Sequence, residues 1–426
     1  MSIILLFSLL FVLLVVGVPV AVALGLSSLV FLVFDGVPSI VVLHNMFNGI
    51  NSFPLIAIPF FILAGHLMNT AGITNKIFAF AKSLVGWLPG GLGHVNVGAS
   101  VVFAGMSGAA VADAGGLGNV EIKAMKNAGY DTDFSVGITA ASSTIGPIIP
   151  PSLPLVIYGV MADTSIGQLF AAGLIPGLLM AISLMLMVSW YAKIRNYPKD
   201  DKFSLCRVWV TFKEAFLPLL TPLIIVGGIS TGVFTPTEAA VAAVAYSIFL
   251  GSVVYRTLNF RRIISVSQET IETTAAILLI VASSTIFAWI LTANQVADGF
   301  AAALLNFTDN KVIILIVMTL LVLLLGCFME TIAAITILVP ILLPIAVKIG
   351  VDPVHFGIIL ILNLMLGLLT PPVGMVLYVL AKVSDTPFEK CVTATLPFLI
   401  PLFIVLLFLT FIPAITMWLP TLIYRS

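Results

Sequence analysis

Two short segments, one in each half of the chain, combine hydroxyl or amide side chains with a glycine and a pair of prolines. The first spans Ser142 to Pro151 and the second Asn363 to Pro372, and each reads Gly-x-x-x-Pro-Pro after its polar residues. Proline removes a backbone donor and glycine tolerates unusual torsions, so we expect each apolar run to be a helix that breaks inside a membrane. Freed backbone carbonyls and amides are tolerated there only where they line a cavity.

Oxygen-bearing side chains gather in and around these predicted breaks. Hard cations prefer oxygen ligands, and unwound carbonyls and helix ends coordinate Na⁺ in secondary transporters. The side chains suited to this role are Ser107, Ser142, Ser143, Thr144, Thr331, Asn363 and Thr370. The predicted topology puts no lysine or arginine at the midplane. We therefore expect an anionic substrate to be held by helix ends, hydroxyls and bound cations.

Asp113 and Glu330 are the two acids that we place at membrane depth. An ionised side chain at the bilayer centre costs about 2.5 to 3.5 kcal/mol, so each needs a partner. One interpretation is that these acids bind Na⁺ directly or hold in place the residues that bind it. The other is that they cap helices by accepting amide hydrogen bonds near a helix start. They stand at different distances from their neighbouring glycines, so they need not be symmetry partners.

The composition places these residues in a membrane. The chain has 426 residues, of which 61% are hydrophobic and 8% charged, and several apolar runs are long enough to cross a bilayer. These values exclude a soluble globular domain and indicate an all-α polytopic membrane protein. Residues 3–34 read as a retained helical hairpin kinked at Gly17 and Pro19 rather than as a signal peptide. The three cysteines follow no disulfide or zinc pattern.

Matching residues recur at a nearly constant spacing, which indicates an internal duplication. Gly146 and Gly367 are 221 positions apart, and Asp163 and Asp385 are 222 apart. The strongly polar stretch between the halves then serves as a connector. We predict a first repeat over residues 1–192, a connector over 193–214 and a second repeat over 215–426.

Charge placement gives the two repeats opposite orientations. The connector is rich in lysine and arginine, which puts it in the cytoplasm by the positive-inside rule. Following the spans outwards from the connector leaves only Lys311, Lys348 and Arg425, of 18 basic residues, on the other side. Each half then crosses the membrane an odd number of times. We therefore expect inverted repeats, with both termini outside the cytoplasm.

Each repeat also has an apolar segment, interrupted by glycine, that is too long for one clean span. We interpret residues 95–120 and 312–346 as re-entrant helical hairpins, the first entering from the cytoplasm and the second from outside. Residues 133–160 and 354–383 are the two broken helices. Moderately amphipathic stretches are typical of helices lying along the interface, with ordinary loops as the alternative. These stretches are residues 38–51, 73–88, 260–272 and 296–306.

The first repeat contains a distinctive series of motifs: Gly105 to Asp113, then Glu121 to Met125, then Gly146 to Ser152. With this series the chain resembles the large membrane subunit of tripartite ATP-independent periplasmic (TRAP) transporters, over essentially its whole length. The resemblance implies an elevator-type, Na⁺-driven importer of organic acids in the bacterial inner membrane, similar to the ion transporter superfamily. It also implies two partners, a small four-helix membrane subunit and a periplasmic substrate-binding protein. Sialic acid is the first expectation for the substrate and a C4-dicarboxylate the second.

The same resemblance implies two or more Na⁺ sites formed by hairpin tips and broken helices. The implied positions are Ser107, Gly108, Ser143 and Gly146 in one half, and Glu330, Thr331, Gly367 and Thr370 in the other. We add Asp113 and Gly326 to these candidates because of their places in the two hairpins. For the substrate we expect the neighbouring positions Ser142, Pro150, Ser152, Asn363 and Pro371.

Other functions fit the sequence less well. A channel would not require matched helix breaks in two halves, and no continuous polar stripe follows several spans. A membrane enzyme would need a catalytic constellation that Asp113 and Glu330 do not supply, and no phosphate-binding Gly-x-x-x-x-Gly-Lys-Ser/Thr pattern occurs. We expect no catalytic residue, organic cofactor, nucleotide or nucleic acid. A proton-coupled carrier of the same architecture is the main alternative.

Overall fold

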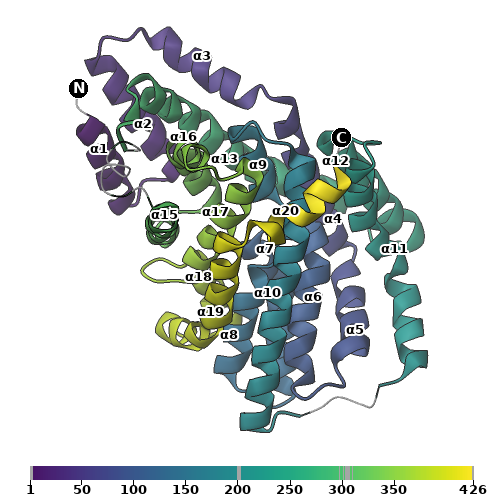
Figure 1. Ribbon diagram of the computed structural model, residues 1–426. Helices are drawn as coiled ribbons and strands as arrows, with labels where there is room; N and C mark the ends of the chain where they lie inside the picture. The colour runs from purple at the N-terminus through teal and green to yellow at the C-terminus, as the bar shows by residue number, and fades with distance from the viewer. Residues whose placement is uncertain are drawn as a thin grey trace.

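The computed structural model is a bundle of packed helices (Figure 1). It describes residues 3–198, 203–296, 298–300, 302, 308 and 310–424, except for the side chains of Ser39, Met106 and Ser107. In this part of the chain the regular structure is helical throughout, as the predicted all-α class requires. Seven of the described helical segments are long and apolar enough to cross a membrane. The chain is therefore a polytopic helical membrane protein.

The amino-terminal helices follow the predicted pattern. α1 (Ile3–Val15) and α2 (Val20–Phe34) are joined at Gly17, whose φ of 89° suits glycine. α3 (Ser39–Ile50) then runs along the upper edge of the bundle as the expected separate helix (Figure 1). α4 (Ala57–Thr70) leads to α5 (Ile73–Val85), which covers most of the amphipathic stretch expected over 73–88.

One expectation for the second half is wrong. The stretch 260–272 is not a separate interfacial helix, because α13 runs without interruption from Phe260 to Ala293. The Asn259 side chain caps its first turn, and no glycine or proline follows within the helix to end it. The stretch 296–306 lies mostly outside the described residues.

The first glycine-rich segment forms two helices, α6 (Gly91–Ser107) and α7 (Ala110–Asn127), which pack against each other. The following run is broken as predicted into α8 (Thr132–Ser143) and α9 (Leu153–Met161). The second half repeats this order with α15 (Lys311–Gly326), α16 (Thr331–Lys348), α17 (Pro353–Gly367) and α18 (Met375–Ser384). The remaining long helices are α10 (Ile166–Arg195), α11 (Leu205–Ser230), α12 (Pro236–Phe249), α19 (Phe388–Phe411) and α20 (Pro413–Ile423).

Contacts between the halves are reciprocal. α7 packs on α18 while its counterpart α16 packs on α9, and α4 packs on α12 while α13 packs on α2. Reciprocal pairs of this kind are typical of two-fold related units. Left-handed turn residues are also paired across the halves: Gly129 with Gly350, and Asp163 with Asp385. These observations support the duplication, whereas the orientation of each half in the membrane stays a prediction.

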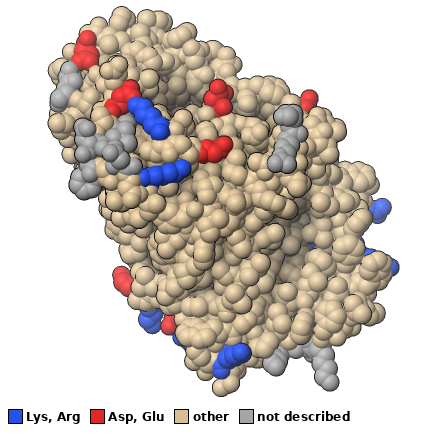
Figure 2. All heavy atoms as spheres, in the orientation of Figure 1, with Lys and Arg blue, Asp and Glu red and all other residues tan. Residues whose placement is uncertain are grey.

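The broken helices lie at the centre of the bundle. α8 is buried from Phe134 to Ser143 and α17 from Val354 to Gly367. α10 approaches the first break closely, since a Cβ added at Gly173 would lie 2.2 Å from the carbonyl oxygen of Ile148. Charged side chains are uncommon over the middle of the face shown in Figure 2, where most lie toward the two ends of the molecule.

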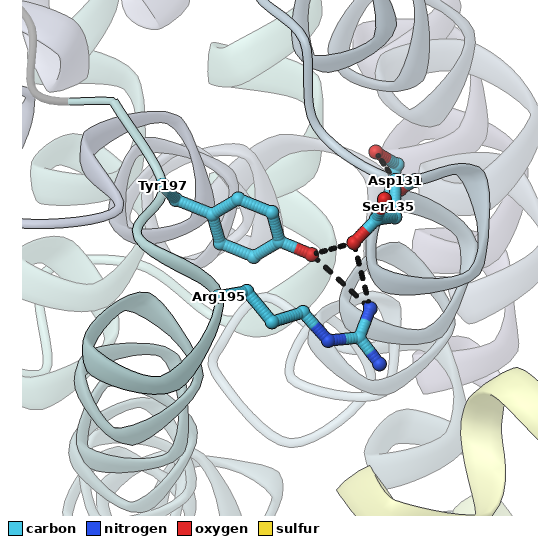
Figure 3. A network of polar contacts seen from close by, with 4 residues as sticks. All are labelled: Asp131, Ser135, Arg195 and Tyr197. Carbon is cyan, nitrogen blue, oxygen red and sulfur yellow. Dashed lines mark hydrogen bonds and ion pairs between the residues drawn. The ribbon is translucent and has the colours of Figure 1, made fainter.

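A polar network ties the start of α8 to the carboxyl-terminal end of α10 (Figure 3). The Tyr197 hydroxyl donates to Asp131 Oδ2 at 2.7 Å, and Arg195 Nη1 donates to the same oxygen at 2.9 Å. The Ser135 hydroxyl donates to the Asp131 carbonyl oxygen at 2.9 Å. The Tyr197 hydroxyl, and after it the Arg195 guanidinium, hold the pKa of Asp131 below its ordinary value.

Replacing Gly173 by alanine tests the close packing of α10 on the first break. The added Cβ would overlap the Ile148 carbonyl, so we expect Gly173→Ala to lower the free energy of unfolding by about 1 to 3 kcal/mol. Gly227→Ala in α11 is the matched control, because no atom lies within 4 Å of its added Cβ. Thermal unfolding of the purified protein measures both, and equal stabilities would contradict the packing.

Replacing Tyr197 by phenylalanine tests the Asp131 network. A carboxyl group with a depressed folded-state pKa stabilises the protein above its unfolded pKa, and this contribution is lost as the pH falls through the folded pKa. Tyr197→Phe should therefore lower the unfolding temperature at neutral pH, with a smaller difference at acid pH. Tyr378 stacks on Phe388 outside this network, so the effect of Tyr378→Phe on the unfolding temperature should be the same at neutral and at acid pH. A pH series of melting curves decides, and a difference independent of pH would be the contrary result.

Candidate functional site

The tip of the first hairpin lies directly against the first helix break. Gly108 joins α6 to α7 with a φ of 59°, and a Cβ added there would lie 2.7 Å from the Pro151 carbonyl oxygen and 3.3 Å from the Leu153 amide nitrogen. Only glycine allows this approach without displacing the backbone. Main-chain atoms of two separate segments therefore meet where Na⁺ ligands are predicted.

The second hairpin meets the second break in a related way. The ends of α15 and α17 touch through their backbones, because a Cβ added at Gly367 would lie 2.5 Å from the carbonyl carbon of Gly326. The Val373 amide donates to the Cys327 carbonyl oxygen at 3.3 Å. Each predicted ion site thus unites a hairpin tip with its own broken helix.

The predicted hydroxyl ligands lie at these junctions. Ser143 ends α8 and donates to the Ala140 carbonyl at 2.8 Å, and Thr370, in the second break, donates to the Leu366 carbonyl at 2.7 Å. A hydroxyl that donates in this way still has lone pairs for a cation. Gly146 is buried in the first break and Thr331 is buried at the start of α16. Ser107 ends α6, but its side chain lies outside the described atoms.

The two acids play different structural roles. Glu330 is the N-cap of α16, and its Oε2 accepts from the Ile332 and Ala333 amides at 2.8 and 3.2 Å, which confirms the capping interpretation. That interpretation is wrong for Asp113. α7 begins at Ala110, so Asp113 already lies inside its first turn, while Ala109 is the N-cap.

Asp113 is only 2% exposed, and within the described atoms no donor meets either carboxylate oxygen in hydrogen-bonding geometry. The Ser100 hydroxyl of α6 lies beside it. Buried polar groups are normally hydrogen-bonded, so two free carboxylate oxygens call for a ligand or a proton. The two carboxylate oxygens of Asp113 could therefore bind an ion at the first site directly or hold in place the residues that bind it.

Both hairpin tips and both breaks border one cavity of about 340 Å³. Its other wall is α13, which contributes Thr273, Ala276, Ile277 and Ile280. Of the predicted ion-site residues, Glu330 and Thr331 line it. A second cavity of about 300 Å³ shares Ala109, Leu153 and Thr273 with the first and extends to His66 and Asn69 of α4. A mostly apolar hollow with few polar groups is typical of a small-molecule site.

The residues predicted for the substrate are not among the described residues that line this cavity. The Ser142 hydroxyl donates to Asn96 Oδ1 at 2.6 Å, and Ser152 caps α9 by accepting from the Leu155 amide. Asn363 Nδ2 donates to the Thr319 carbonyl at 2.7 Å. Pro150 is buried in the first break, whereas Pro371 is exposed in the second. Thr273 and Met365, which do line the cavity, carried no sequence signal that distinguishes them from other core positions.

A buried polar network beside Ser142 was also missed. Asn96 Nδ2 donates to Glu121 Oε2 at 2.6 Å and to Thr139 Oγ1 at 2.7 Å, so that α6, α7 and α8 are joined by side chains. These residues are far apart in sequence and belong to three helices. Only the polar character of each within an apolar segment could have drawn attention to them.

Comparisons with known proteins agree over nearly the whole chain. The family model described as the tripartite ATP-independent periplasmic transporter, DctM component, matches residues 7–415. The sialic acid TRAP transporter large permease protein SiaM of Vibrio cholerae is 51% identical over 96% of both chains. The sialic acid TRAP transporter permease protein SiaT of Haemophilus influenzae is 43% identical over 96% of this chain and 66% of its own length, so this chain spans just under two thirds of it.

A relative named for another substrate and one solved structure complete the comparison. The C4-dicarboxylate TRAP transporter large permease protein DctM of Vibrio cholerae is 35% identical over 99% of this chain and 98% of its own. The crystal structure of the Alcanivorax borkumensis YdaH transporter, reported to have an unusual topology, matches 88% of this chain and 87% of its own with a TM-score of 0.60. At 15% identity this likeness concerns the fold alone. On the family match and the full-length relatives, this chain belongs to the DctM family, the large permease component of TRAP transporters.

Proposed function

We propose that this chain carries an organic acid into the bacterial cytoplasm, driven by Na⁺, as the transport subunit of a TRAP system. The observation that carries the proposal is the cavity of about 340 Å³ at which both hairpin tips and both helix breaks meet. Ion sites and substrate site would then be neighbours. Binding of Na⁺ at the tips would supply the positive charge that a carboxylate requires, since the described lining of both cavities includes no lysine or arginine.

The proposed substrate is sialic acid, with a C4-dicarboxylate as the second candidate. The relatives named for sialic acid are 51% and 43% identical, whereas a relative named for C4-dicarboxylate is 35% identical. The mixture of apolar walls with Thr273, His66 and Asn69 suits a ligand that has both apolar and hydroxylated parts. A periplasmic binding protein would deliver it and contribute to selection.

The proposed movement is of elevator type. α13 packs on α2, α3 and α4, and α11 packs on α5 and α12, which would make these helices a fixed frame. The hairpins and the broken helices would move against this frame as one body, because α7 packs on α8 and α18 while α16 packs on α9 and α17. The cavity lies on the boundary, with α13 as its frame wall.

The proposed location is the bacterial inner membrane, with both termini periplasmic. The exposed face of α11 is rich in large apolar side chains: Trp209 is 59% exposed and Leu223 65%. Such a surface suits lipid and the small four-helix membrane subunit that we propose as a partner. α1 and the last turns of α20 lie in the upper half of Figure 1, whereas the ends of α10 and α11 that flank the connector lie at the bottom, and this separation supports the proposed orientation.

The coupling ion can be tested with the complete complex in proteoliposomes. Uptake of labelled N-acetylneuraminate should require Na⁺ and rise more than linearly with its concentration, because two or more ions bind. The large permease reconstituted alone should be inactive, since it would lack both partners. Undiminished uptake in a sodium-free proton gradient would favour the proton-coupled carrier, and full transport by this chain alone would contradict the tripartite system.

Glu330 can be tested so that capping and ion binding are separated. Glu330→Ser keeps an N-cap but removes the carboxylate, so capping alone predicts normal transport. We expect instead that Glu330→Ser and Glu330→Ala both weaken the apparent Na⁺ affinity, by about five- to a hundredfold if about 1 to 3 kcal/mol is lost. Ser107→Ala should weaken the apparent Na⁺ affinity in the same way at the site of the first hairpin.

The control for Glu330 is a second capping glutamate. Glu238 completes a capping box with Thr235 at the start of α12, where it is exposed. Glu238→Ala should remove the hydrogen bond from the Thr235 amide at the start of α12 without changing the Na⁺ dependence of uptake. If the Glu330 variants transport with the Na⁺ dependence of the parent, the second hairpin tip is not an ion site.

A further inference from the structure

Glu121 is a buried carboxyl group that the predicted ion and substrate positions do not include. It lies near the middle of α7 and is 1% exposed. Its Oε2 accepts one hydrogen bond, from Asn96 Nδ2 at 2.6 Å. Its Oε1 is fully enclosed and has no hydrogen-bond partner among the described residues. The side chain therefore has one neutral donor for two oxygens.

Glu330 shows what a buried carboxylate needs in the same protein. Its oxygen accepts from two backbone amides at a helix start, where the helix dipole also favours negative charge. Charged carboxylates in protein interiors are stabilised by several donors or by a paired cation, and an unpaired buried charge costs several kcal/mol. Glu121 has neither the donors nor the helix end.

The charged groups on the elements around Glu121 do not provide a counter-ion. α7 packs on α6, α8 and α18. These elements carry His94 on α6, Asp131 and Asp133 at the start of α8, and Lys382 on α18, while α7 itself carries Asp113, Lys123 and Lys126. Lys126 is engaged with the Ser384 carbonyl at 2.7 Å. Within the described part of the chain, the charged group that acts on Glu121 is Asp113, which is another acid.

The surroundings are also too poor in free oxygen for a metal ion. A hard cation takes about six oxygen ligands. Asn96 Oδ1 already accepts from Ser142, and Thr139 Oγ1 donates to the Ser135 carbonyl at 2.8 Å and accepts from Asn96. Asp113 is eight residues away on the same helix, which is about 12 Å along the axis, so one ion could not be bound by both acids. Glu121 Oε1 remains as a single free atom, which suits a proton.

We propose that Glu121 is a proton-binding site inside the permease, separate from the Na⁺ sites at the hairpin tips. The hydrogen bonds from Glu121 through Asn96 to Ser142 reach the end of α8, next to Ser143 at the first helix break. Loss of the proton would leave an unpaired buried charge on Glu121 and loosen the packing of α6, α7 and α8. Uptake at saturating Na⁺ should therefore fall in alkaline solution, a consequence that rests on the proposed transport function.

The pH profile of uptake by the complete complex tests this consequence. One linked proton shifts an equilibrium by up to about tenfold per pH unit, so the parent should lose activity with about that slope on the alkaline side. Glu121→Gln keeps the shape and the acceptor but cannot ionise, and should retain uptake there. Glu389→Gln, an exposed acid in the first turn of α19, is the matched control and should follow the parent. A Glu121→Gln profile identical to the parent's overturns the proposal.

Infrared spectroscopy of the purified complex tests the proton itself, without transport. The parent should show the carbonyl band of a protonated carboxyl group at neutral pH; Glu121→Gln should lose it and Asp113→Asn should keep it. If Glu121→Gln does not assemble, Asn96→Ala serves instead, because loss of the one donor to the charged form should extend the band to higher pH. If the band is unchanged in Glu121→Gln, or in Asn96→Ala where that variant replaces it, Glu121 is not the proton-binding group. If uptake proves independent of Na⁺ while these band changes are observed, Na⁺ is not the coupling ion, but the proton-binding site at Glu121 is still supported.

Discussion

Backbone atoms of the two hairpin tips lie against backbone atoms of the two broken helices, and the arrangement of the bundle depends on this contact. It requires that Gly108 and Gly367 have no side chain at the points of approach. In a membrane, non-helical backbone is tolerated where other protein segments or a polar cavity satisfy it. The tips meet that requirement for the breaks, as the bond between the Val373 amide and the Cys327 carbonyl illustrates. The backbone atoms that satisfy the helix breaks therefore lie where Na⁺ is predicted to bind.

Much of the helical order could be predicted from residues that stop helices. The Pro-Pro pairs mark both breaks, several glycines mark the first hairpin and Gly326 marks the second, because these residues act locally on the backbone. The error at 260–272 has the opposite cause. The amphipathic character of this stretch favours a helix lying along the interface, but nothing in the backbone stops α13 there, so the helix continues from Phe260 to Ala293. The composition of a segment indicates whether it faces lipid, protein or water, whereas the end of a helix is set by a capping residue or a helix-breaking residue.

The side-chain roles were less accessible, because they depend on where helix starts fall and on partners from other helices. A shift of a few residues separates Glu330, which caps α16, from Asp113, which lies inside the first turn of α7. The contact of Asn96 with Glu121 and Thr139 depends on the packing of three helices, which no spacing in the chain encodes. The predicted substrate residues share this limitation, since their proximity to the breaks says nothing of which side of the backbone faces the cavity.

The distribution of charge suggests an order of events for the proposed transport. The described walls of the two neighbouring cavities contain carboxylate, hydroxyl, amide and imidazole groups but no lysine or arginine, and Glu330 itself is negative when ionised. An organic acid entering such a site without cations would meet like charge in a poorly hydrated space, which costs several kcal/mol. Na⁺ at the tips would reverse the sign of the local field and tighten the tips on the breaks. On this argument Na⁺ would bind before or together with the acid, and a carrier without Na⁺ would not transport the acid.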